Sequence, residues 1–364
     1  MITFLIILLA LVSGIWLYMQ TPKFGKDPSG ERLERIKQSP HFKEGKFANL
    51  HFTPTLTEGY SMFGVLYDQF FKPKPNLKPN HSIPSTKTDL HSLDRSENIL
   101  IWFGHSSYFI QLAGKRFLID PVFSGSASPV PGSVKAFVGT DRYTVEDLPQ
   151  IDYLLITHDH YDHLDYETIK AVTPKIDKVI CGLGVGSHLE YWGYAASKIT
   201  ELDWSETIKL ESTLTLHTAP TRHFSGRSFS RNNTLWVSYI LETPQQKLYL
   251  GGDSGYDTHF KDIGERYGPF DLAILESGQY NLAWEAIHLL PPQTLVAATD
   301  LKAKRLFPVH SGKFVLSTHP WNEPLSEVYR INQEKYQLPL ATPMIGEKLY
   351  LDNQNQIFTE WWKE

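Results

Sequence analysis

The stretch Thr157–His163, which reads Thr-His-Asp-His-Tyr-Asp-His, brings three imidazoles and the Asp162 carboxylate within six positions. Neutral imidazole and carboxylate are the ligands that zinc-class divalent metals prefer. The five residues before it, 152–156, read Asp-Tyr-Leu-Leu-Ile and are typical of a buried β-strand. The cluster therefore follows the end of a strand, and a metal site explains it better than a solvated polar loop does.

Charge and cysteine content narrow the class of protein. The 364 residues include 35 basic and 40 acidic side chains, so the formal net charge is −5, and no stretch is rich in lysine and arginine. A nucleic-acid groove needs concentrated positive charge, so we expect no nucleic-acid partner. The single cysteine, Cys181, excludes an intrachain disulfide framework and a cysteine-rich metal site.

The N-terminus differs in kind from the rest of the chain. The first 22 residues carry no charged side chain, and Ile2–Met19 is almost entirely apolar, which is long enough to cross a bilayer as one helix. Met1–Thr3 lacks the positive charge of a usual secretory signal, so we expect residues 1–22 to form an uncleaved, single-pass anchor in the lipid bilayer, with a signal sequence as the alternative. Five lysines and arginines follow within residues 23–37, and the positive-inside rule then predicts that the rest of the chain faces the cytoplasm.

Residues 23–95 are expected to form an extended arm. Four prolines, at positions 73, 75, 79 and 84, interrupt a polar stretch with little periodicity, as in a wrapping or linking segment. Within the arm, residues 63–71 are apolar enough to pack on the main domain or to touch lipid, and we expect core packing. The main domain is then expected to occupy residues 96–364.

Strands and helices alternate from residue 96, and the same order occurs twice. The first copy has a hairpin ending at Asp120, a strand ending in the histidine cluster, a helix near 166–172 and a further strand. The second copy has a hairpin ending at Asp253, a strand, a helix near 292–299 and a strand that ends at His310. Two halves that each bury a sheet against helices predict an α/β, four-layer sandwich whose polar strand ends meet along one edge.

Three further residues stand where such an edge would draw metal ligands. His223 lies in a turn-rich segment after the strand 214–216, and His310 ends a strand. Asp253 lies in a glycine-flanked turn, where the backbone can approach an ion closely. Together with the histidine cluster, they provide enough ligands for a two-metal site.

The combined pattern resembles the metallo-β-lactamase superfamily over roughly residues 96 to 340. The resemblance implies an αββα fold for a catalytic domain at 96–364, and two Zn²⁺ ions as cofactors, with Mn²⁺ or Fe²⁺ also compatible. The ligands it implies are His158, His160 and His223 for one metal, Asp162, His163 and His310 for the other, and Asp253 as the bridge. Asp120 would orient the ligands from behind.

Three short segments, 102–107, 233–236 and 308–314, resemble the N-acylphosphatidylethanolamine-hydrolysing phospholipase D group and its bacterial relatives. This resemblance implies a membrane-lipid substrate and attack on phosphorus by a hydroxide that bridges the two metals. His288 matches an active-site histidine of the group, and its implied role is to hydrogen-bond the phosphoryl oxygen or to protonate the leaving group. Asp162 is expected to steer the proton of the nucleophile.

Several alternatives stay open. His105, in a turn after the strand 98–103, either supports the metal site from behind or makes only a structural hydrogen bond. A lactonase or other small-molecule hydrolase of the same fold, or a non-catalytic metal-binding scaffold, would use the same ligands, and a homodimer is compatible with each. The glycine-rich run 182–187 is interpreted as a tight turn with Ser187 as a helix N-cap, and Trp361–Trp362 as either core or membrane-interface residues.

Overall fold

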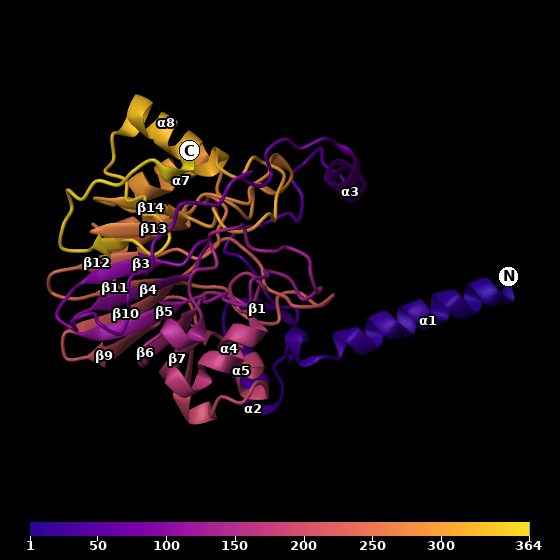
Figure 1. Ribbon diagram of the computed structural model, residues 1–364. Helices are drawn as coiled ribbons and strands as arrows, with labels where there is room; N and C mark the ends of the chain where they lie inside the picture. Colours follow the sequence, from indigo (N-terminus) through magenta and orange to yellow (C-terminus); the bar gives the residue numbers. More distant parts are fainter. Residues whose placement is uncertain (364) are drawn as a thin grey trace.

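The computed structural model describes residues 1–363, so Glu364, the last residue of the expected main domain, lies outside the described residues. Two mixed sheets form the centre of the molecule (Figure 1). In sheet order, the seven strands of the first are β15 (Lys348–Tyr350), β3 (Ile99–Trp102), β4 (Tyr108–Leu112), β5 (Lys115–Ile119), β6 (Ile151–Ile156), β7 (Ile176–Gly182) and β8 (Ile199–Leu202). The six strands of the second are β14 (Leu306–Val309), β13 (Leu272–Glu276), β12 (Lys247–Leu250), β11 (Ser238–Glu242), β10 (Leu214–Ala219) and β9 (Thr207–Glu211).

Helices cover the outer face of each sheet, which makes four layers. The first sheet carries α4 (Tyr166–Val172) and α5 (Gly186–Tyr191), and the second carries α6 (His259–Arg266), α7 (Pro291–Asp300) and α8 (Glu323–Ile331). The core between the sheets includes Phe117 and Leu241, the core under α4 and α5 includes Leu154, and the core under α7 includes Leu295. The αββα architecture predicted from the sequence is therefore confirmed.

The two sheets repeat one arrangement of strands. β5, β6 and β7 run parallel to one another, and so do β12, β13 and β14, while a hairpin precedes each parallel set. Parallel strands end at the same edge of a sheet, so the loops that follow β5, β6, β12, β13 and β14 meet there. This edge holds the predicted metal ligands.

Before the main domain, the chain runs across its surface. The arm contains α2 (Gly30–Ile36), β1 (Phe42–Lys43), β2 (Lys46–Phe47) and α3 (Met62–Phe71), and it buries Ile36 and Phe47 in the core between the sheets. α1 (Ile2–Met19) projects away from the body with none of its residues buried (Figure 1). Its length and its mean hydropathy of 2.4 make it a candidate membrane span on those grounds alone.

The structure corrects one expectation about the arm and one about a helix cap. α3 does not pack in the core, because Phe63 and Phe71 are 81% and 73% exposed. Ser187 lies inside the first turn of α5, after the cap residue Val185, and its hydroxyl donates instead to the carbonyl of Asp27 in the arm, at 3.1 Å. Trp361–Trp362 are both buried, so of the two alternatives for this pair the core is confirmed.

Candidate metal centre

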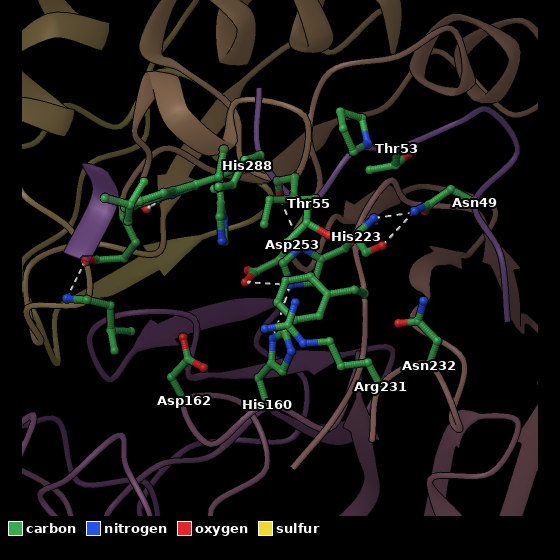
Figure 2. Close-up of a pocket in the computed structure, with 18 of the residues that line it drawn as sticks. Asn49, Thr53, Thr55, His160, Asp162, His223, Arg231, Asn232, Asp253 and His288 are labelled. Atoms are coloured by element: carbon green, nitrogen blue, oxygen red, sulfur yellow. Dashed lines mark hydrogen bonds and ion pairs between the residues drawn. The ribbon is translucent and has the colours of Figure 1, made fainter. Parts of the chain in front are cut away.

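Seven side chains converge at the edge where the parallel strands end. They are the seven ligands predicted from the sequence, and we call them the floor: His158, His160, Asp162, His163, His223, Asp253 and His310. Figure 2 labels four of them, His160, Asp162, His223 and Asp253. All seven are buried except His160 and Asp162, which are partly exposed to the cavity above them. Within each local group, one potential ligand atom from every residue lies within 4.8 Å of the others.

Three imidazoles form the first group. His158 and His160 follow β6, and His223 follows β10. Nε2 of His158 and Nε2 of His223 lie 2.9 Å and 3.2 Å from Nδ1 of His160. The second ring nitrogen of His158 is 3.0 Å from the hydroxyl of Thr157, and that of His223 is 2.9 Å from the carbonyl of Ile287. Partners behind the rings thus fix two of the three imidazoles, and three nitrogens converge as they do around one cation.

Asp253 connects this group to the second one. Its Oδ2 lies 3.8 Å from Nε2 of His158, while its Oδ1 lies 3.2 Å from Nε2 of His163 and 3.1 Å from Nδ1 of His310. Oδ2 of Asp162 lies 3.6 Å from the same nitrogen of His163. One carboxylate therefore reaches both groups, which is the arrangement that a bridging ligand needs.

Two buried residues outside the floor, Asp120 and His105, hold floor side chains in position through hydrogen bonds. Asp120, directly after β5, accepts hydrogen bonds from the backbone N–H of Thr157 at 2.8 Å and from its hydroxyl at 2.6 Å. Oδ2 of Asp120 also accepts from Nδ1 of His163 at 2.8 Å, which leaves Nε2 of that ring directed into the floor. Nε2 of His105 lies 2.9 Å from Oδ2 of Asp162. Of the two alternatives for His105, its position agrees with support of the metal site.

The backbone around the floor is strained. His105, Asp120, Gln279 and His310 have φ angles of 54°, 41°, 57° and 66°, in the left-handed region. Such conformations cost a non-glycine residue about 1–3 kcal/mol and concentrate at functional sites. The N–H of His310 donates to the carbonyl of His105 at 3.1 Å, so two of these strained residues hold each other. The strain therefore lowers the stability of the fold, and the same backbone conformations fix the directions of these side chains.

Burial controls the protonation of the floor. It lowers the pKa of His160 to about 4 and holds the pKa values of His158, His223 and His310 well below the usual value. Burial would also lower the pKa of His163, but the facing carboxylates of Asp253 and Asp162 outweigh it and raise that pKa well above its usual value. Burial raises the pKa of Asp253 to about 6. Most floor imidazoles are thus neutral at neutral pH, which is the form that binds metals.

Unpaired atoms show that the floor fits cations. Within the described residues, Nε2 of His160, Nε2 of His163 and Oδ1 of Asp253 are buried without a hydrogen-bond partner. A buried polar atom without a partner costs free energy, and coordination would satisfy Nε2 of His163 and Oδ1 of Asp253, which point into the floor. The donor set contains imidazole and carboxylate and no sulfur, which suits zinc and also manganese or iron. The residues present therefore fit a pair of divalent cations.

A carboxylate that the sequence did not reveal supports His288. Nδ1 of His288 lies 2.6 Å from Oε2 of Glu276, the last residue of β13, and the His288 ring faces the cavity. The other carboxylate oxygen of Glu276 accepts from the N–H of Ser254 at 2.5 Å. A signal for Glu276 did exist: in the repeat of strands 152–156 and 271–275, it occupies the position of Thr157.

A cavity of about 380 Å³ opens above the floor (Figure 2). Its walls include the apolar side chains Phe224, Trp284, Ile287 and Leu316, and the arm adds Asn49, residues 53–56, Met62 and Val65. Asn49 fixes this part of the arm, because its amide donates to the carbonyl of His223 at 2.8 Å and accepts from the N–H of His223 at 3.1 Å. The part that the arm plays in the site was not predicted, since its sequence does not signal where it packs.

Arg227 ties the histidine loop, residues 158–163, to the beginning of the arm. Its guanidinium donates to the carbonyls of Asp159 and Leu164, at 2.8 Å and 2.7 Å, and to the carbonyl of Lys23 at 2.6 Å. The same group lies 4.1 Å from the centre of the Tyr161 ring. One buried cation thus joins both ends of the histidine loop to the residues that follow α1.

Comparison with known proteins agrees with this fold. Residues 115–311 match the family model described as beta-lactamase superfamily domain. The chain belongs to this superfamily, and it is a metal-dependent hydrolase with a metallo-β-lactamase fold.

Individual relatives extend the comparison over most of the chain. An uncharacterized protein of Mycobacterium tuberculosis is 35% identical over 97% of this chain and 96% of its own length. The N-acyl-phosphatidylethanolamine-hydrolyzing phospholipase D 1 of Caenorhabditis elegans is 31% identical over 74% of this chain and 79% of its own length. A metallo hydrolase of Ignicoccus hospitalis, at 21% identity, superimposes with a TM-score of 0.54 over 70% of this chain and 98% of its own, which shows the shared fold.

Proposed function

We propose that the protein is a phosphodiesterase that hydrolyses a membrane phospholipid in the manner of an N-acylphosphatidylethanolamine phospholipase D. The cavity carries this proposal, because a floor of imidazoles and carboxylates lies at the base of apolar walls. A phosphodiester and the acyl chains attached to it would each meet a matching surface. The relative in Caenorhabditis elegans that is named for this activity supports the same choice.

The floor would hold two divalent cations. His158, His160 and His223 would bind one, Asp162, His163 and His310 the other, and Asp253 would bridge them. When bound, such cations act as Lewis acids that polarise the phosphoryl group and lower the pKa of water. Asp120 and His105 would keep His163 and Asp162 in place from behind.

Two side chains that face the cavity would move protons. In the proposed reaction, water attacks phosphorus, the bond to the alcohol oxygen breaks, and phosphatidic acid and an N-acylethanolamine are released. Asp162 faces the cavity and would take up the proton of the attacking water. His288, held by Glu276, would donate a hydrogen bond to a phosphoryl oxygen or a proton to the departing alcohol.

Arg231 would help to select an anionic substrate. Among the described residues that line the cavity, it is the side chain with a permanent positive charge. Its guanidinium lies 4.7 Å from the centre of the Phe224 ring, and that ring packs 4.5 Å from His160 of the floor (Figure 2). A phosphodiester placed on the floor would therefore lie within its electrostatic reach, whereas a neutral lactone would gain little from it.

We also propose that α1 anchors the protein in a bilayer and that the main domain faces the cytoplasm. The apolar composition of α1 and the basic residues within 23–37 support both points. An anchor would keep the cavity close to its lipid substrate.

The test is product analysis with purified, metal-analysed protein. The protein is incubated with N-acylphosphatidylethanolamine and, separately, with a panel of lactones, and products are identified by mass spectrometry, with His160→Ala as the control. Phosphatidic acid together with N-acylethanolamine, both absent with the control, is the expected result. Intact lipid with opened lactones would move the protein to the lactonase branch, and bound metal without hydrolysis of either would indicate a binding scaffold.

A further inference from the structure

α3 presents an apolar face to solvent. Phe63, Leu66, Tyr67 and Phe71 follow one another at helical spacing on a single face, and all four are exposed. Large apolar side chains on a surface are common singly, but a contiguous set on one helix face indicates a contact surface. No described residue covers this face.

The opposite side of α3 belongs to the active-site cavity. Met62 and Val65, on the inner side of the helix, line the cavity together with floor residues. The segment before α3 is fixed to the main domain, since the N–H of Thr57 donates to the carbonyl of Ala283 at 2.8 Å, and Arg222 donates to the hydroxyl of Thr53 at 3.0 Å. α3 therefore stands at the mouth of the cavity with one face inward and its apolar face outward.

A second exposed apolar surface lies between the cavity and α1. Phe229, which is 88% exposed, and Val130 line a hollow together with Ile15 and Tyr18 of α1. Two residues beyond Phe229 the same loop reaches the cavity, where Arg231 forms part of the lining. The loop therefore links the point where α1 leaves the main domain to the mouth of the cavity.

We propose that α3 lies on the surface of the lipid bilayer that α1 enters, and that α3 and the Phe229 loop turn the mouth of the cavity toward the lipid. Figure 1 shows α1 and α3 on the same side of the body, with α3 level with the end of α1 that is nearest the body. The seven residues 72–78, after α3, contain three lysines and no acidic residue, a composition that suits lipid phosphates. This inference rests on the proposed membrane attachment and not on the proposed chemistry.

A fluorescent label can test the contact without any turnover. Cys181 is fully buried, so Phe63→Cys introduces the accessible thiol for an environment-sensitive nitrobenzoxadiazole label. The full-length protein is reconstituted in vesicles of phosphatidylcholine and phosphatidylglycerol. Emission should shift to the blue on reconstitution and should be quenched by lipids that carry bromine on the acyl chain.

A matched label defines the background. Ile357 is 91% exposed and follows β15, an edge strand of the first sheet, so Ile357→Cys should show neither the shift nor the quenching. Equal spectra at both positions would overturn the proposal. A blue shift that appears already in detergent and grows with protein concentration would also overturn it, in favour of a second copy of the chain on α3.

Activity provides a second readout. The double variant Phe63→Ser with Phe71→Ser removes apolar area outside the cavity and the floor, so its metal content should stay unchanged. Hydrolysis of phospholipid in vesicles should fall at least about tenfold, which is the order expected from exposing a buried aromatic side chain. Hydrolysis of the same lipid in detergent micelles should remain close to wild type. Loss in both media would contradict the proposal, and a labelled position 63 in lipid without any phospholipid hydrolysis would leave it standing while the proposed chemistry fails.

Discussion

The floor and the mouth of the cavity are built in opposite ways. The floor consists of side chains at strand ends of the main domain, mostly buried and often held by a second partner such as Asp120. The mouth consists of residues 49–65 of the arm and of the segments 224–232 and 279–288. It includes exposed residues such as Met62 and Arg231. Sheet topology thus fixes the chemistry, whereas segments that the sheets do not constrain set access and selectivity. Changes in the floor should therefore abolish activity, and changes in the mouth should tune it.

The largest effect should come from His160→Ala, because this substitution removes one of the three converging imidazole nitrogens of the first group. Loss of one cation removes several kcal/mol of transition-state stabilisation, so kcat/KM should fall roughly 10³-fold. Metal analysis should show reduced metal per protein, while circular dichroism stays unchanged. His91→Ala, in an exposed histidine of the arm, is the control. Near-normal turnover of His160→Ala would remove this residue from the site.

Asp120→Asn should weaken the floor without removing a ligand. The Asn side chain has one oxygen in place of two, so either the N–H of Thr157 or Nδ1 of His163 loses its acceptor. Substitution of such supporting residues costs about 10- to 100-fold in metal affinity, which competition with a chelator would measure. Unchanged affinity would mean that the orientation of His163 does not depend on Asp120.

Glu276→Gln lies on the border between floor and mouth and should have a smaller effect. The amide has only one oxygen, so it can no longer accept both from the His288 ring and from the N–H of Ser254, and kcat should fall about tenfold with metal content retained. A double-mutant cycle with His288→Ala provides the control, because residues that act through one another give non-additive losses. Additive losses would show that Glu276 acts independently of His288.

The smallest effect should come from Arg231→Met. An exposed cation contributes about 0.2–1 kcal/mol, so KM for an anionic phosphodiester should rise only about two- to fivefold, with kcat unchanged. Arg266→Met, in an arginine exposed on α6, should leave KM as it is. An equal rise of KM for a neutral ester would show that Arg231 shapes the mouth without reading charge.

The sequence predicted the floor far better than the mouth, and the reason is physical. His158, His160, Asp162 and His163 lie within one loop, and the strand pattern placed His310 at the same edge, so a local motif and the sheet topology were enough. Glu276 is a single carboxylate at the end of an apolar strand, and its partner His288 comes 12 residues later. Nothing local indicates that pairing.

The arm shows the other limit of the sequence. Composition identified residues 63–71 as apolar, but composition does not say which way an apolar face points, and the expected core packing was wrong. The same holds for Asn49, whose bonds to His223 span 174 positions of the chain. Contacts of this kind depend on where a proline-rich segment crosses the finished sandwich, which no periodicity encodes.

Arg227 has a mechanical consequence. Its guanidinium grips the carbonyls of Asp159 and Leu164, on either side of the last two histidines of the loop, and also that of Lys23, four residues after the end of α1. If α1 sits in a bilayer, as proposed, a pull or tilt of that helix is transmitted through one side chain to the loop that carries His160 and Asp162. Changes in bilayer thickness or lateral tension would then alter the geometry of the histidine loop through the Arg227 side chain alone.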